Sequence, residues 1–97
     1  MSYEIIFAPE AVQDLKRLSA RNRSIVQDAI EKHLRFEPDK VSQNRIKRLR
    51  GIRHPQYRLR VSDIRVFYDI VGEEVEILAI VQKSEAAAWL AEMGEVE

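Results

Sequence analysis

The sequence has 97 residues and a mass of 11.3 kDa, a length that fits one domain of ordinary size. Hydrophobic residues make up 45% and charged residues 33% of the chain, which indicates a soluble folded domain and argues against disorder. Because there is no cysteine, disulfides, thiol catalysis and cysteine-based zinc sites are excluded, and a reducing, cytoplasmic location is expected. No apolar run approaches the roughly 18 residues of a membrane span, and no basic-then-apolar signal peptide opens the chain.

The net charge of zero hides a strong segregation of charge along the chain. Residues 1–39 carry six basic and seven acidic side chains. Residues 40–65 carry nine basic and one acidic side chain, whereas residues 66–97 carry one basic and eight acidic side chains. Seven of the nine central cations are arginine, whose planar guanidinium suits bidentate contacts with phosphate. This local excess of positive charge indicates an anionic partner, although a solvated basic surface gives the same pattern.

The first third of the chain predicts a strand followed by two helices. Residues 3–7 are short and apolar-leaning, which is typical of a strand. A helix is expected to start at Pro9, since proline is favoured in the first turn. Apolar residues at helical spacing predict a second helix, capped by Asn22 or Ser24 and ending near Phe36. We therefore expect this helical hairpin to serve as a structural scaffold.

Beyond residue 45 the apolar pattern changes from helical spacing to alternation. Strands are predicted at 45–49, 57–61, 64–71 and 75–81, and a final helix at 86–93. The nearly continuous apolar run of the last strand predicts that it is the central one. The predicted order is β-α-α-β-β-β-β-α, a single α+β domain with an antiparallel sheet packed against the helical hairpin. The glutamate-rich end, about residues 92–97, is expected to fray as an acidic tail.

The familiar catalytic motifs are missing, since there is no glycine-rich phosphate loop, no HExxH and no GxSxG. His33 falls on the apolar stripe of the second helix, and His54 precedes a proline in a predicted turn. We therefore expect no two-histidine ribonuclease dyad and interpret His33 as a packed residue at the edge of the core. Carboxylates are numerous, but none is paired in an apolar setting, so glycosidase chemistry has no support.

A row of cations on paired strands is the strongest candidate site. Alternation places Arg58 and Arg60 on one face of their strand, and Arg65 opens the next strand across a short turn. Lys83 ends the last strand, near the start of the final helix. Such a basic sheet face would bind a backbone phosphate and stabilise charge developing on it. The alternative is that these arginines form cross-strand ion pairs with the nearby acids, Asp63, Asp69 and Glu76.

These residues resemble a family signature. The segment Leu49-Arg50-Gly51, followed by the run YRLRVSDIRVFY at residues 57–68, is similar to the pattern of the RelE/ParE toxins of type II toxin-antitoxin systems. The resemblance spans about residues 3 to 91, and the short helical hairpin is closer to the RelE branch than to the ParE branch. The fold it implies is the RelE-like fold, which is similar to that of microbial ribonucleases.

The resemblance implies a metal-independent, cofactor-free endoribonuclease, an mRNA interferase that cleaves mRNA in the ribosomal A site and so inhibits translation. The 2′-hydroxyl of the RNA would attack the adjacent phosphate. The implied catalytic residues are Arg58, Arg60, Arg65 and Lys83. The RNA-binding residues are expected to be Lys47, Arg48, Arg50, Arg53 and Trp89. Arginine does not act as an ordinary general base, so the resemblance leaves the base unassigned. For Trp89, stacking on a base and anchoring the last helix are both open.

Two other functions stay open beside the nuclease. One is a ParE-like inhibitor of DNA gyrase without nuclease activity, and the other is a catalytically weak relative that retains antitoxin binding. All three imply a cognate small antitoxin, for whose acidic segment the basic stretch 40–65 is a natural target. The nuclease reading adds the ribosome and mRNA as partners, and none of the three involves a membrane.

Overall fold

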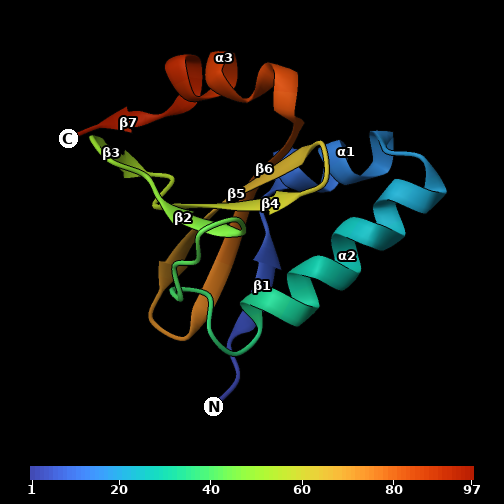
Figure 1. The fold of residues 1–97 in the computed structure, drawn as a ribbon, viewed down its shortest axis with the longest axis horizontal. Coiled ribbons are helices and arrows are strands. Elements are labelled where there is room, and N and C mark those ends of the chain that lie inside the picture. Colours follow the sequence, from blue (N-terminus) through green and yellow to red (C-terminus); the bar gives the residue numbers. More distant parts are fainter.

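A five-stranded sheet separates two helices on one face from a third helix on the other (Figure 1). The computed structural model describes all 97 residues. Its elements are β1 (Glu4–Phe7), α1 (Pro9–Arg17), α2 (Ala20–Leu34), β2 (Ile46–Arg48), β3 (Ile52–His54), β4 (Tyr57–Val61), β5 (Ile64–Val71), β6 (Glu74–Gln82), α3 (Lys83–Met93) and β7 (Glu95–Val96). The predicted α+β class and the predicted order of the main elements are confirmed.

The sheet has the strand order β1-β6-β5-β4-β2. The pairs β2–β4, β4–β5 and β5–β6 are antiparallel, as predicted, whereas β1 pairs with β6 in parallel. The middle position belongs to β5, so the prediction that residues 75–81 form the central strand is wrong. β6 has a neighbour on each side and contacts α1 on one face and α3 on the other, which accounts for its apolar run.

The core lies between the sheet and the helical hairpin of α1 and α2. α2 contributes Val26, Ile30 and Leu34, all nearly inaccessible to solvent. Alternate residues of β4 and β5, among them Leu59 and Tyr68, face them across the layer because side chains alternate along a strand. The Tyr68 hydroxyl donates a hydrogen bond to the Pro38 carbonyl oxygen at 2.6 Å, and burial raises the pKa of this phenol above its ordinary value.

α2 begins earlier than the sequence indicated. Ser19 is the N-cap, and its Oγ accepts a hydrogen bond from the backbone N–H of Asn22 at 3.1 Å. The prediction of Asn22 or Ser24 as the cap is therefore wrong by about one turn. The Arg23 guanidinium donates to the Leu15 carbonyl and to two further carbonyls at the end of α1, so the capping groups tie the two helices together. None of the three helices is long and apolar enough to cross a membrane.

The C-terminal residues form an element that the sequence did not predict. Glu95 and Val96 make β7, which pairs antiparallel with β3, and the Glu97 N–H donates to the Gly51 carbonyl at 3.3 Å. The expectation that this acidic end frays is therefore wrong for these residues. β3 was expected only as a turn before residue 57. Two-residue and three-residue strands carry too little pattern to be recognised before their partner is known.

Candidate functional site

Three arginines occupy the sheet face opposite the helical hairpin, and we call Arg58, Arg60 and Arg65 the arginine face. Arg60 lies directly across from Arg65 in the β4–β5 register, and Arg58 lies across from Phe67. Leu59, between the two β4 arginines, points the other way into the core. The alternation of β4 and the register of the tight β4–β5 hairpin thus bring together the three arginines, as the sequence predicted.

No acidic side chain compensates these charges. The ion pairs of the structure involve Arg17, Arg35, Lys40 and His54, and none includes a residue of the arginine face. The alternative of cross-strand ion pairs is therefore not realised. The Nε of Arg58 is buried without a hydrogen-bond partner. Burial, and then the charges of Arg65 and Arg60, lower the pKa of Arg58. The arginine face is thus an electropositive surface whose counter-charge must come from outside the chain.

Arg65 has a structural role in addition to its charge. It is only 7% exposed, and its Nη1 donates to the carbonyl oxygens of Ser62 at 2.7 Å and Ile64 at 3.0 Å. Ser62 has a positive φ of 54°, so these hydrogen bonds brace a turn in the left-handed region. Both Nη1 hydrogens take part in these hydrogen bonds, whereas the N–H groups of Nε and Nη2 make none within the chain. Arg65 therefore holds the hairpin and still offers donors to an anion.

α3 covers the sheet beside the arginine face through a single aromatic contact. The Trp89 indole stacks on the buried ring of Phe67, with ring centroids 4.9 Å apart and an interplanar angle of 9°. No residue of α3 is fully buried, so this stack is its main anchor. The anchoring role left open by the sequence is therefore present in the structure, and stacking of Trp89 on a nucleobase stays a prediction.

Lys83 lies at the end of β6, next to the turn that Arg65 braces. It is the first residue of α3, its side chain is exposed, and its backbone N–H donates to the Asp63 carbonyl at 2.7 Å. A shallow cavity there is lined by Asp63, Gln82, Lys83 and Ser84, and by none of the arginines. Lys83 thus adjoins the arginine face at its turn end and does not lie within it.

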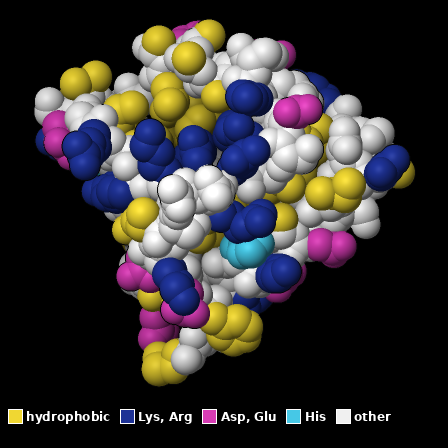
Figure 2. Space-filling model, in the orientation of Figure 1, with side chains coloured by type: hydrophobic (Ala, Val, Ile, Leu, Met, Phe, Trp, Pro, Cys, Tyr) yellow, Lys and Arg dark blue, Asp and Glu magenta, His cyan; other side chains and the backbone are white.

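The other predicted RNA-binding residues divide between two faces. Lys47 lies across from Arg58 and extends the arginine face onto the edge strand β2. Arg48 lies across from Tyr57, stacks over its ring at 5.2 Å and donates to the Gln56 carbonyl at 2.8 Å. Arg50 is exposed in the turn that follows β2, and Arg53 is exposed in β3. Figure 2 shows a row of Lys and Arg side chains below α3, beside a hollow lined by hydrophobic side chains.

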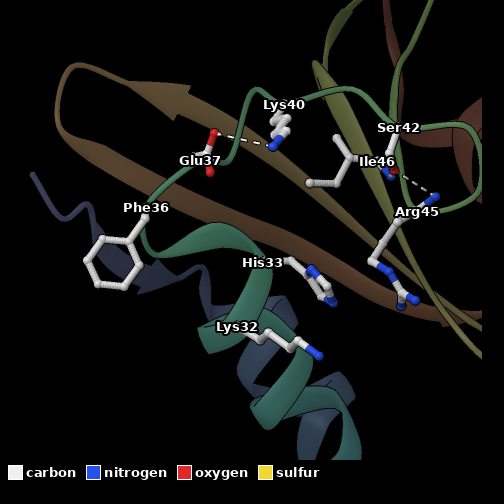
Figure 3. Close-up of a pocket in the computed structure, with 8 residues that line it drawn as sticks. All are labelled: Lys32, His33, Phe36, Glu37, Lys40, Ser42, Arg45 and Ile46. Carbon is white, nitrogen blue, oxygen red and sulfur yellow. Dashed lines mark hydrogen bonds and ion pairs between the residues drawn. The ribbon is translucent and has the colours of Figure 1, made fainter.

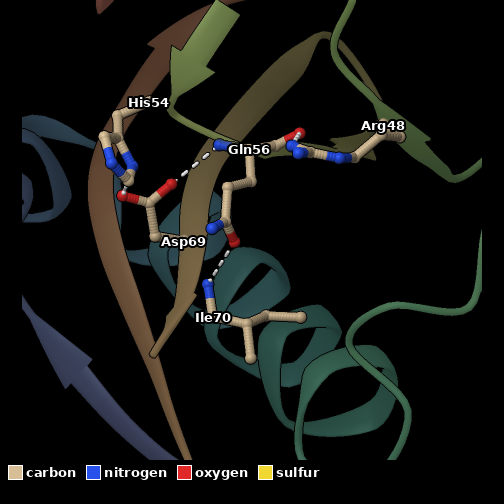
Figure 4. A network of polar contacts seen from close by, with 5 residues as sticks. All are labelled: Arg48, His54, Gln56, Asp69 and Ile70. Atoms are coloured by element: carbon tan, nitrogen blue, oxygen red, sulfur yellow. Dashed lines mark hydrogen bonds and ion pairs between the residues drawn. The ribbon is translucent and has the colours of Figure 1, made fainter. Parts of the chain in front are cut away.

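A polar network beside this row was not foreseen from the sequence (Figure 4). His54 Nδ1 and Asp69 Oδ2 are 2.8 Å apart, and Asp69 Oδ1 accepts from the Gln56 N–H at 2.7 Å. The Gln56 Oε1 in turn accepts from the Ile70 N–H at 2.8 Å. These bonds fasten the chain between β3 and β4 onto β5. Fifteen residues separate His54 from Asp69, so no local spacing in the sequence signals the pair.

The fold and the arginine face define a small α+β domain with an electropositive surface that no acidic side chain of the chain neutralises. The chain belongs to the RelE/ParE toxin family: the family model of the ParE toxin of the type II toxin-antitoxin system parDE matches residues 5–87. The comparison with curated proteins gives no significant match.

Solved RelE structures share the fold. The RelE toxin of the RelB–RelE complex from Methanococcus jannaschii is 23% identical, with a TM-score of 0.64 over 87% of this chain and 96% of that one. The RelBE2 complex from Mycobacterium tuberculosis gives 24% identity and a TM-score of 0.65, over 84% and 99% of the two chains. A mutant of the E. coli toxin RelE in the free state is 23% identical, with a TM-score of 0.68 over 95% of this chain and 94% of that one. At these identities the likeness shows the fold.

Proposed function

We propose that this protein is the toxin of a type II toxin-antitoxin system and acts as a ribosome-dependent endoribonuclease that cleaves mRNA in the ribosomal A site. The observation that carries the proposal is the arginine face, three guanidinium groups on rigid strands with no acid to neutralise them. A protein keeps such a surface at a cost to its own stability when an external anion completes it. The resemblance of the sequence to RelE-like toxins, which implies mRNA as the substrate, supports RNA as that anion.

Cleavage by this face is a phosphoryl transfer within the RNA. The 2′-hydroxyl oxygen bonds to the adjacent phosphorus, the bond from phosphorus to the 5′-oxygen breaks, and a 2′,3′-cyclic phosphate forms. Negative charge builds up on the non-bridging oxygens in the transition state. Arg58, Arg60 and the free donors of Arg65 would stabilise that charge, and groups fixed on strands need little reorganisation to do so.

Two protons must move in this reaction. The 2′-hydroxyl loses one, which passes to the solvent, because a guanidinium is already protonated at working pH and cannot accept a proton. The leaving 5′-oxygen gains the other, for which the exposed ammonium of Lys83 is the proposed donor, since it adjoins the arginine face at the turn. Binding of the RNA would position the reacting atoms, so charge stabilisation and alignment supply the larger part of the proposed rate enhancement.

One observation favours a second function, inhibition of DNA gyrase by a ParE-like mechanism. The family model that matches the chain is that of the ParE toxins. In this alternative the arginine face binds a protein, and no RNA is cleaved. A third outcome is a toxin relative that binds its antitoxin and has little activity of its own.

A cognate antitoxin is the proposed protein partner. The solved relatives from M. jannaschii and M. tuberculosis are toxin-antitoxin complexes, and the basic stretch 40–65 offers an acidic segment complementary charge. Reversing Arg48, Arg50 and Arg53 to glutamate is expected to weaken binding of an acidic antitoxin peptide. Arg50 and Arg53 are exposed and make no side-chain hydrogen bond, whereas Arg48 also stacks over Tyr57 and donates to the Gln56 carbonyl. The reversal of Arg50 and Arg53 alone is therefore the control that changes charge without removing these contacts.

The deciding experiment is pulse labelling of protein and DNA synthesis in cells after induced expression. Arg60→Ala is the informative variant, because Arg60 is exposed and its side chain makes no hydrogen bond, whereas Arg65 also braces a turn. Arg21→Ala is the matched control, since it removes one exposed arginine from the far end of α2.

The nuclease proposal expects a rapid loss of protein synthesis with the wild type and with Arg21→Ala, and a much weaker effect with Arg60→Ala. Primer extension on cellular mRNA would then place the cuts at A-site codons. A block of DNA synthesis with translation continuing would contradict the proposal and establish the gyrase alternative. If neither process slows, the protein is the inactive relative.

A further inference from the structure

A basic cavity lies outside the arginine face, where α2 ends and the chain returns towards β2. It has a volume of about 390 Å³. Lys32 and His33 reach it from the last turn of α2, and Arg45 reaches it from the residue just before β2. Figure 3 shows these three side chains pointing into the same space. Segments distant in sequence thus place three nitrogen groups around one opening.

The positive charge of this cavity is not matched by acids. Lys32 and Arg45 form no ion pair. The acidic side chain lining the cavity is Glu37, which pairs with Lys40 at 3.8 Å at the exposed rim. Burial, and then the charges of Arg45 and Lys32, lower the pKa of His33 below its ordinary value. A bound anion would reverse the effect of those charges and favour the imidazolium.

A serine hydroxyl adds a donor of a different kind. Ser42 lines the same cavity, and its Oγ accepts hydrogen bonds from the backbone N–H groups of Arg45 and Ile46, each at 3.1 Å. These bonds engage the oxygen lone pairs, so the hydroxyl hydrogen is free to donate outward. Ammonium, imidazolium, guanidinium and hydroxyl donors around one opening suit an oxyanion with several acceptor oxygens, as a phosphate has.

The cavity lies next to the strand that carries Arg60, although no residue of the arginine face lines it. The Arg60 N–H donates to the Arg45 carbonyl at 2.8 Å, so the two residues are neighbours across adjacent segments. Phe36 also lines the cavity and is 63% exposed, and Figure 3 shows its ring turned away from Lys32, His33 and Arg45. An exposed ring at the rim offers a platform for an unpaired base of the strand whose phosphate is bound, which favours a nucleic acid over a carboxylate side chain.

We propose that this cavity is a second phosphate-binding site, in which Lys32, His33 and Arg45 contact a phosphodiester of single-stranded RNA. The assignment to RNA rests on the proposed function, whereas the phosphate site itself does not. The RNA can be the strand whose other phosphate lies on the arginine face, or a separate strand. In both cases the affinity rises as the pH falls through the pKa of His33, because only the protonated imidazole attracts the anion.

The test is an NMR titration of the His33 ring of the full chain with inorganic phosphate, and then with a 2′-O-methylated RNA of about 12 nucleotides, which cannot be cleaved. Both ligands are expected to raise the pKa of His33. Arg45→Ala is expected to weaken RNA binding about tenfold and to reduce the salt dependence by about 0.7 in slope. The control, Arg21→Ala, lies about 18 Å along α2 from His33 and is expected to change neither.

The outcomes separate the alternatives. A loss of RNA affinity with both Arg45→Ala and Arg60→Ala supports one strand crossing both sites, and a loss with Arg45→Ala alone supports a separate strand. Phosphate that leaves His33 unchanged overturns the site. A glutamate-rich peptide that acts on His33 as strongly as the RNA overturns the RNA assignment in favour of an acidic protein. Because binding is measured without cleavage, an inactive toxin that still binds RNA here refutes the proposed function and leaves this site standing.

Discussion

Replacing Arg58 with methionine is expected to stabilise the fold and weaken the function at the same time. The methionine side chain is unbranched and fills much of the volume of the arginine stem, so packing of the stem is largely retained. The substitution removes the buried Nε that has no hydrogen-bond partner. It also removes the repulsion from Arg65 and Arg60, which together with burial lowers the pKa of Arg58.

The size of the gain follows from the unpartnered group. A buried donor without an acceptor costs about 1–3 kcal/mol. The Arg58 side chain is only partly buried, so the lower end of that range applies, and we expect the free energy of unfolding to rise by about 1 kcal/mol. For a domain of this size such a gain corresponds to an increase in Tm of roughly 4–8 °C.

Urea unfolding at low and high salt measures the effect and separates its two causes. Arg60→Met is the matched control, because Arg60 is exposed and has no buried unpartnered atom, and its stability is expected to change by less than about 0.5 kcal/mol. Salt screens charge repulsion, so the difference between wild type and Arg58→Met is expected to shrink at high salt. A less stable Arg58→Met protein, or an equal gain in the control, would refute the idea that the arginine face is held at a cost.

Three further changes probe the contacts around the face. Trp89→Ala removes the stack on Phe67, so we expect the free energy of unfolding to fall by about 2 kcal/mol and α3 to lose protection from hydrogen exchange. Trp89→Phe is expected to keep most of the stability and most of the protection. Asp69→Ala leaves the His54 and Gln56 donors unpartnered, and urea unfolding is expected to show a loss of about 2–3 kcal/mol, which Asp69→Asn partly restores. Tyr68 keeps its proton in the folded state above pH 10, where the unfolded phenol loses it. The free energy of unfolding should therefore fall by about 1.4 kcal/mol for each pH unit of increase, from this residue alone. Tyr68→Phe is expected to abolish this contribution in unfolding curves measured from pH 9 to about 11.

Strong local patterns made most of the fold predictable. The alternation of residues 57–61 identified β4 and also identified which of its residues point away from the core, because both follow from the two-residue period of a strand. The parallel pairing of β1 was not predictable in this way. A short strand carries the same pattern whichever direction its neighbour runs, and the direction is decided by how the helical hairpin returns the chain to the sheet.

The same distinction between local sequence pattern and tertiary structure applies to the candidate site. The grouping of Arg58, Arg60 and Arg65 follows from one hairpin and was predicted, but the absence of acidic partners depends on the whole structure. Asp69, an expected partner of these arginines, binds His54 instead, through a β3 strand that the sequence did not reveal. The cavity around His33 was missed for a similar reason. On its helix that residue has the spacing of a core position, and Arg45 meets it only through the long return to β2.

The distribution of charge connects these features. The chain has equal numbers of acidic and basic residues, so it has enough acids to neutralise every arginine. In the structure the other acids are paired elsewhere, exposed or, in the case of Glu76, half-buried without an ion pair. Asp69, buried on the same strand as Arg65, is held by His54 and Gln56. The His54–Asp69 pair therefore withholds the nearest buried carboxylate from the arginine face. On this view its disruption would affect function as well as stability, since a released Asp69 would neutralise charge that the proposed RNA ligand requires.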